Sequence, residues 1–125
     1  MQAGGFSDIV MDHFLHPRNA GTLPAPCGEG WSGSVESARF MRIQVHLQDG
    51  RVAEARFGTY GCAPAIAAGS YLTSWACGRP ISEVQTATAQ WLEEALGGLP
   101  SARRYCAELA VAALRKAISD AIERS

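Results

Sequence analysis

Long apolar runs are absent from this sequence, and neither sign of charge dominates it. No stretch approaches the roughly 20 apolar residues that a membrane-spanning helix needs. The chain carries 11 Lys and Arg against 12 Asp and Glu, and a net charge of -1 without a basic cluster argues against nucleic-acid binding. Residues 1–5 have neither the positive charge nor the apolar segment of an export signal. We therefore expect a cytoplasmic protein with no nucleic-acid or membrane partner.

Cysteine is sparse, and its expected state follows from the missing export signal. The 4 cysteines could form disulfides in a secreted protein, but here reduced thiols or metal ligands are expected. A chain of 125 residues, 47% of them hydrophobic, is long enough for one modest core. We expect residues 1–125 to form a single domain.

The first half of the chain predicts one helix followed by a sheet. Ser7 is the expected N-cap of a helix over 6–15, which Pro17 ends. Apolar and polar residues alternate over 41–48, which predicts a strand with one buried face and leaves His46 in solvent. The Asp-Gly pair at 49–50 predicts a hairpin to a partner strand over 52–57, and a third strand is expected over 31–37.

A glycine-rich corner follows the predicted sheet at residues 57–64. Gly58 and Gly61 allow a tight turn from strand to helix, and Pro64 suits the first helical turn, where its missing N–H costs nothing. Cys62 therefore lies at or just before the start of a helix over 65–76. Unpaired backbone N–H groups there favour a thiolate, although a small residue that only fills the corner would give the same pattern.

Helical patterns fill the remainder of the chain. A single turn over 81–84 precedes a helix over 89–96, and a last helix runs from about Ser101 almost to the end, with Cys106 on its apolar stripe. This order predicts an α+β fold: an N-terminal helix, a three-stranded antiparallel sheet, and several helices on one sheet face, the C-terminal helix being long. The large aromatic side chains are expected to pack in the core or between helices: Trp31, Trp75, Trp91, Tyr60 and Tyr71.

Several short motifs follow one another along the chain: Asp12-His13-Phe14 with residues 17–21, the corner over 59–62 with the helix start at 65–67, and Leu99-Pro100 ahead of Cys106. In this order they resemble the NifU/IscU family of iron–sulfur cluster assembly scaffolds, over nearly the whole chain. The resemblance implies a scaffold or carrier, not an enzyme, that binds iron or a [2Fe–2S] cluster. It also implies a cysteine desulfurase and iron–sulfur acceptor proteins as partners.

The resemblance assigns the cluster to three cysteines, of which this chain keeps two. Cys62 matches the second and Cys106 the third, so both are candidate ligands of a cluster or metal. Ser37 stands at the position of the first cysteine, Arg39 at that of an aspartate, and Tyr105 at that of a histidine. We expect these three residues to shape the site.

Arg39 changes the electrostatics expected of such a site. A guanidinium in place of a carboxylate opposes a ferrous or zinc ion, and it favours a thiolate or persulfide at Cys62 and Cys106. Zinc is therefore a disfavoured alternative to iron. Glu36 could supply a ligand oxygen, but we expect it to pair with Arg39.

Two further cysteines need to be placed. Cys27 lies in a Pro/Gly-rich loop that leads to the predicted hairpin, and it is an alternative ligand in place of Ser37. Cys77 follows Cys62 by 15 residues, roughly 22 Å along a helix, and is excluded. By the family resemblance, the segment over 99–103 provides candidates for docking a partner: Leu99, Pro100 and Arg103.

Two hypotheses remain open from the sequence. In the first, the chain is a scaffold or carrier whose two cysteines hold a cluster at a dimer interface or together with exogenous thiols. In the second, it builds no clusters and is a binding or sulfur-relay partner of a desulfurase or of a true scaffold. The family resemblance favours the first, whereas Ser37, Arg39 and Tyr105 favour the second.

Overall fold

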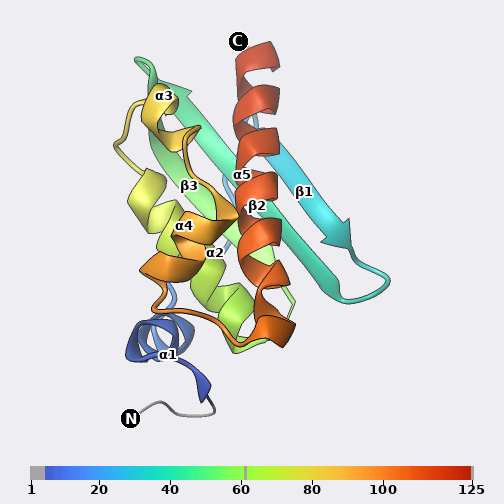
Figure 1. Ribbon diagram of the computed structural model, residues 1–125. Coiled ribbons are helices and arrows are strands. Elements are labelled where there is room, and N and C mark those ends of the chain that lie inside the picture. The colour runs from blue at the N-terminus through green and yellow to red at the C-terminus, as the bar shows by residue number, and fades with distance from the viewer. Residues whose placement is uncertain (1–4, 61, 125) are drawn as a thin grey trace.

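The computed structural model describes residues 5–60 and 62–124, in which three strands form an antiparallel sheet. The strands are β1 (Gly28–Ser34), β2 (Arg39–Gln48) and β3 (Arg51–Thr59), with β2 in the centre (Figure 1). Ile43 of β2 pairs with Gly30 of β1 and Phe57 of β3. The third strand expected over 31–37 is present, but it starts earlier and ends at Ser34, where the turn to β2 begins.

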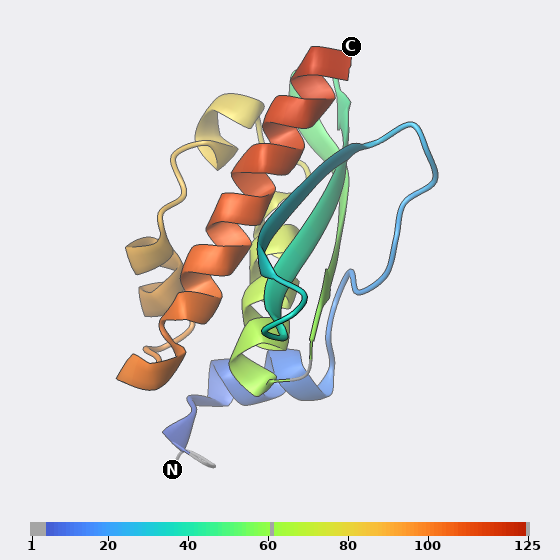
Figure 2. The same ribbon diagram turned by 90° about the vertical axis from the view of Figure 1, so that its right-hand side faces the viewer.

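The described helices are α1 (Asp8–Leu15), α2 (Ala63–Ala76), α3 (Ile81–Val84), α4 (Ala89–Ala95) and α5 (Tyr105–Arg124), with a 3₁₀ turn over Ser101–Arg103. Helices α2 and α5 pack on one face of the sheet, whereas α1 packs against α2 and α4 against α5. The long helix α5 lies against β1 and β2, and α2 lies against β3 (Figure 2). The predicted α+β architecture is confirmed. None of the described helices combines the length and apolarity that crossing a bilayer requires.

Local signals in the sequence fix the ends of these elements. The Ser7 hydroxyl accepts the N–H of Val10 at 3.1 Å, as expected of the N-cap of α1. Asp49 and Gly50 adopt positive φ values of 54° and 73°, which suit the tight β2–β3 hairpin. The last helix starts at Tyr105 instead of near Ser101, because the 3₁₀ turn precedes it.

The segment over 16–27 covers part of the other sheet face. The N–H of buried Leu23 donates to the Gln44 side chain at 2.7 Å, and Arg42 donates to the Gly21 carbonyl at 2.8 Å. Nε2 of His46 lies 3.1 Å from the Pro24 carbonyl oxygen, and the His46 side chain is only 28% exposed. The prediction of a solvated His46 is therefore wrong, because this segment folds back over the strand.

The inner face of β2 forms the centre of the core, as its alternation predicts. Met41, Ile43 and Val45 are completely buried beneath the helical layer. The α5 residues that bury against the sheet are mostly small, so the helix axis can approach the strands closely. These buried α5 residues are Cys106, Ala107, Ala110, Val111, Ala113, Leu114, Ala117 and Ile118.

Helix α5 approaches β1 very closely. A Cβ atom added to Gly30 would clash with the backbone of Ala113 and Ala117. Along the free edge of β1, the Asp120 carboxylate accepts the Glu29 N–H at 2.9 Å. This contact therefore sets the position of α5 along the sheet, and with it the place where α5 begins.

We predict that Gly30→Ala lowers the free energy of unfolding by about 2–3 kcal/mol, because the added methyl group forces α5 away from β1. Gly50→Ala is the matched control: its Cβ meets nothing within 4 Å, so only the left-handed backbone costs energy, about 1 kcal/mol. Urea unfolding followed by tryptophan fluorescence measures both. Equal losses in the two variants would contradict the close-contact explanation.

Candidate functional site

Two thiols from distant parts of the chain meet at one end of the fold. Cys62 is the N-cap of α2, with extended backbone and with Pro64 in the first turn, as the corner motif predicts. Cys106 lies in the first turn of α5 and is completely buried, whereas Cys62 is half-buried. Their Sγ atoms are 3.8 Å apart. The structure therefore brings together the two cysteines that the sequence singles out.

The spacing of these sulfurs suits one shared metal ion. Two thiolates bound to a tetrahedral ion at about 2.3 Å lie about 3.8 Å from each other. In the described residues, no group of three or more His, Cys, Asp or Glu side chains is arranged to hold a metal. Among the described residues, Cys62 and Cys106 are therefore a pair of candidate soft ligands without a third ligand of these types beside them.

An Arg–Tyr stack lies where the resemblance places a carboxylate and an imidazole. The guanidinium carbon of Arg39 is 4.5 Å from the centre of the Tyr105 ring, a cation–π contact. The expected Glu36–Arg39 ion pair is wrong: no described ion pair joins them, and Glu36 lies exposed in the β1–β2 turn. Arg39 starts β2 and lies over the Tyr105 ring, and none of the described carboxylates forms an ion pair with its guanidinium.

Burial controls the protonation of the inner thiol. Desolvation, followed by the neighbouring Cys62, raises the pKa of Cys106 to about 12, although hydrogen bonding by Tyr105 and the charge of Arg103 oppose the rise. Burial also raises the pKa of Tyr105, and the two thiols add to that shift. Cys106 is therefore a neutral thiol at physiological pH. A metal ion that binds it must displace its proton.

Ser37 does not replace the missing cysteine in this geometry. Its hydroxyl donates to the Ser34 carbonyl at 3.1 Å and closes the β1–β2 turn, in which Ala38 has a φ of 59°. Ser37 is exposed, and it shapes the site only by holding this turn beside Arg39.

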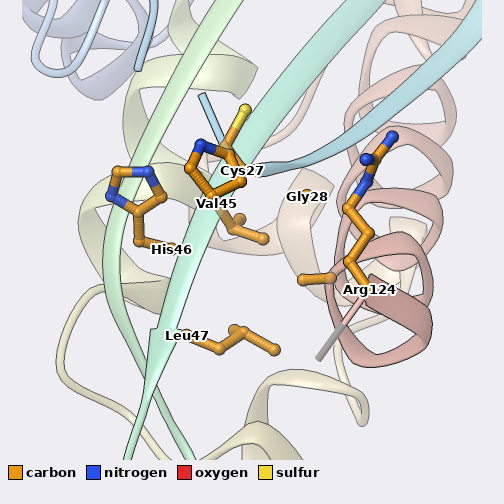
Figure 3. Close-up of a pocket in the computed structure, with 8 residues that line it drawn as sticks. Cys27, Gly28, Val45, His46, Leu47 and Arg124 are labelled. Atoms are coloured by element: carbon orange, nitrogen blue, oxygen red, sulfur yellow. The ribbon is translucent and has the colours of Figure 1, made fainter. Parts of the chain in front are cut away.

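Cys27 lies far from the other two thiols. Its neighbour Gly28 packs against Ala121 of α5, which is 15 residues and roughly 22 Å along the helix from Cys106. There Cys27 lines a pocket together with His46, Leu47 and Arg124 (Figure 3). The hypothesis that Cys27 is a displaced ligand is therefore wrong, because β1 carries it to the opposite end of the sheet.

The remaining candidates divide between core and surface. Cys77 caps the far end of α2, so its exclusion from the site is confirmed. Leu99, a docking candidate, is only 8% exposed and belongs to the core. Pro100 and Arg103 stay partly exposed just ahead of Cys106, and they remain docking candidates.

Sequence reasoning missed an aromatic cluster beside the site. Trp31 is 44% exposed and stacks on Phe40, with the two ring centres 5.6 Å apart. Tyr60 is 65% exposed and contacts Phe40 edge-on, with the ring centres 6.2 Å apart. The expectation that Trp31 and Tyr60 pack in the core is wrong, whereas Trp75 and Trp91 do pack together, with ring centres 4.5 Å apart. The alternation of β2 could have predicted this exposed cluster, because Phe40 falls at a position that alternates with the polar residues of the strand and therefore lies on their face of the sheet.

Comparisons with known proteins identify the family and the fold. The family model described as NifU-like N-terminal domain matches residues 5–125. The iron–sulfur cluster assembly scaffold protein IscU 1 of Archaeoglobus fulgidus is 42% identical, over 92% of this chain and 75% of its own length. The IscU scaffold protein of Azotobacter vinelandii is 37% identical over 92% of both chains. A NifU-like N-terminal structure from Brucella abortus shares the fold, with a TM-score of 0.72 at 15% identity over 95% of both chains.

We predict that iodoacetamide modifies Cys62 well before Cys106 in the native, metal-free protein, because Cys106 is completely buried and its raised pKa leaves little thiolate at pH 8. Peptide mass spectrometry gives the order of labelling. Labelling in denaturant is the control, in which this difference should disappear.

The raised pKa of Cys106 also predicts how stability depends on pH. Since the folded-state pKa of Cys106 lies above that of an unfolded thiol, the free energy of unfolding should fall as the pH rises from about 9 towards 12.

Proposed function

Because this chain belongs to the family of NifU-like N-terminal domains, we propose that it is an iron–sulfur cluster assembly protein, a scaffold or carrier that holds iron or a [2Fe–2S] cluster through Cys62 and Cys106. The observation that carries the proposal is the 3.8 Å between the two Sγ atoms. Thiolates are the ligands that iron–sulfur clusters prefer. The relatives described above are themselves named as cluster assembly scaffolds.

The surroundings of the two thiols suit an anionic cargo that enters and leaves. A cluster bound by thiolates carries negative charge, and the backbone N–H groups at the start of α2 and the guanidinium groups of Arg39 and Arg103 offset that charge. The same cations disfavour a bare Zn²⁺ or Fe²⁺ ion. We infer that the cargo is the assembled cluster and that zinc binds weakly.

The incomplete ligand set determines how the cargo is held. Two cysteines leave coordination positions that a second copy of the chain or small thiols must fill. Loose, partly external ligation is what a protein needs if it is to pass a cluster onward, and it is not suited to a permanent cofactor. A cysteine desulfurase is the inferred sulfur source and iron–sulfur proteins the inferred recipients, so the chain acts as a scaffold and not as an enzyme.

We predict that anaerobic reconstitution with iron, cysteine and a cysteine desulfurase gives the visible absorption of a [2Fe–2S] cluster, and that Cys62→Ser and Cys106→Ser each abolish it. The matched control is Cys27→Ser/Cys77→Ser, which keeps only the two site thiols and should retain the full signal, because both replaced cysteines lie away from the site. Absorption that survives in Cys62→Ser, or that is lost in the control, would refute this ligand assignment.

We predict that Arg39→Asp raises the affinity for Zn²⁺, and that Arg39→Gln gives an intermediate value. Each unit of charge removed from this exposed position should be worth about tenfold in affinity, after allowance for solvent screening. Anaerobic competition against a chromogenic chelator measures the three dissociation constants. Equal affinities would show that the guanidinium has no electrostatic influence on the thiols.

A further inference from the structure

The aromatic cluster of Trp31, Phe40 and Tyr60 is an exposed surface beside the candidate site. Trp31 and Tyr60 are 44% and 65% exposed, and Val35 in the neighbouring β1–β2 turn is 59% exposed. Exposed tryptophan and tyrosine side chains are among those that most often carry the binding energy of protein–protein interfaces. A patch of this kind therefore indicates a surface on which another chain packs.

The aromatic cluster lies at the same end of the sheet as the two thiols. Tyr60 is two residues ahead of Cys62 in the chain. Arg39, the neighbour of Phe40 in β2, lies over the ring of Tyr105 at the start of α5. The β1–β2 turn ends the sheet at this place (Figure 1). A chain that packs on the aromatic cluster therefore also lies close to the candidate site.

The charges around the aromatic cluster suit a contact between two identical surfaces. The guanidinium carbon of Arg42 is 6.0 Å from the centre of the Trp31 ring, and Glu36 lies exposed in the β1–β2 turn. Neither Arg42 nor Glu36 forms an ion pair in the part of the chain that the structure describes. A contact with twofold symmetry brings each residue of a pair together twice, so one acid and one base on the same surface give two ion pairs.

Two further observations favour a second copy of the chain over a different protein. The net charge of -1 causes little repulsion between copies. Among the described residues, no third His, Cys, Asp or Glu ligand lies beside Cys62 and Cys106. A [2Fe–2S] cluster takes four thiolates, and two copies of this pair supply four.

We propose that the aromatic cluster is the contact surface of a homodimer, in which two copies of the cluster face each other across a twofold axis. Glu36 of each copy pairs with Arg42 of the other. The choice of a second copy rests on the proposed function, which it deepens by naming the surface that brings the second pair of thiols to the site. The contact itself is made by aromatic and charged side chains and needs no metal, so it can be tested without iron.

The size of the aromatic cluster sets the expected strength of the dimer. A large aromatic side chain buries 150–250 Å² when fully covered, so the open parts of Trp31 and Tyr60 give roughly 200 Å² per copy. Even with its charged rim, this contact belongs to the small interfaces, below about 1,200 Å² in total, which are weak and reversible. We expect a dissociation constant in the micromolar range, which lets the copies separate and release a shared cargo.

The test is sedimentation equilibrium of the full chain, reduced and free of metal, over micromolar to millimolar concentrations. The variants Trp31→Ser and Tyr60→Ser remove apolar area from the contact, whereas Glu36→Gln and Glu36→Arg change its charge. Ile122→Ser is the matched control, because Ile122 is an apolar residue of similar exposure, 47%, at the opposite end of α5 from the candidate site.

We expect a reversible dimer whose dissociation constant rises at least tenfold in Trp31→Ser, Tyr60→Ser and Glu36→Arg and stays unchanged in Ile122→Ser. Glu36→Gln should raise it less and should make it less sensitive to salt, because the ion pair is lost. A parent that stays monomeric overturns the inference. So does a dimer that Ile122→Ser weakens as much as Tyr60→Ser, or one that Glu36→Arg leaves unchanged.

Hydrogen exchange of the parent needs no variant, so the result stands even if Trp31→Ser folds poorly. The backbone amides over 35–40 should exchange more slowly in concentrated than in dilute protein, and equal exchange would overturn the inference. The reconstitution with iron is read separately. A monomer that binds a cluster would retain the proposed function and lose only this inference, whereas a dimer that binds no cluster would do the reverse.

Discussion

The packing of α5 onto β1 is the constraint on which the rest of the structure depends. Glycine at positions 28 and 30 lets the helix backbone approach the strand, and the Asp120 carboxylate holds the strand edge. This contact determines how far α5 extends along the sheet. Its first turn therefore reaches the corner between β3 and α2, where Cys106 meets Cys62. A shift of α5 along its axis by one residue, about 1.5 Å, would separate the sulfur atoms of Cys62 and Cys106.

The site that results has two thiols and a cation–π pair in place of a fuller set of ligands. Arg39 lies over Tyr105 and carries the opposite charge to the carboxylate expected at its position, and we propose that this charge disfavours a bare cation and favours an anionic cluster. The proposed cluster binding depends on the 3.8 Å between the two sulfurs, a spacing that suits two ligands of one metal ion.

The sequence predicted most elements because their signals are local. The N-cap at Ser7, the Asp-Gly hairpin and the Pro64 helix start each act within a few residues, and all three appear in the structure. Errors arose where distant segments cover or expose a side chain. The segment over 16–27, which precedes β1 in the chain, covers His46, and it leaves Trp31 open on another part of the same sheet face.

By itself, the sequence determined the α+β order of elements, the place of Cys62 at a helix start, the burial of Cys106, and the loss of the other ligands. Each of these follows from local periodicity or from residue identity at a motif. Only the tertiary structure decided that the two sulfurs are 3.8 Å apart, that Arg39 lies on Tyr105 instead of pairing with Glu36, and that Cys27 is far away. Those distances depend on the position at which α5 packs on β1, because residues far apart in the chain become neighbours only through that packing.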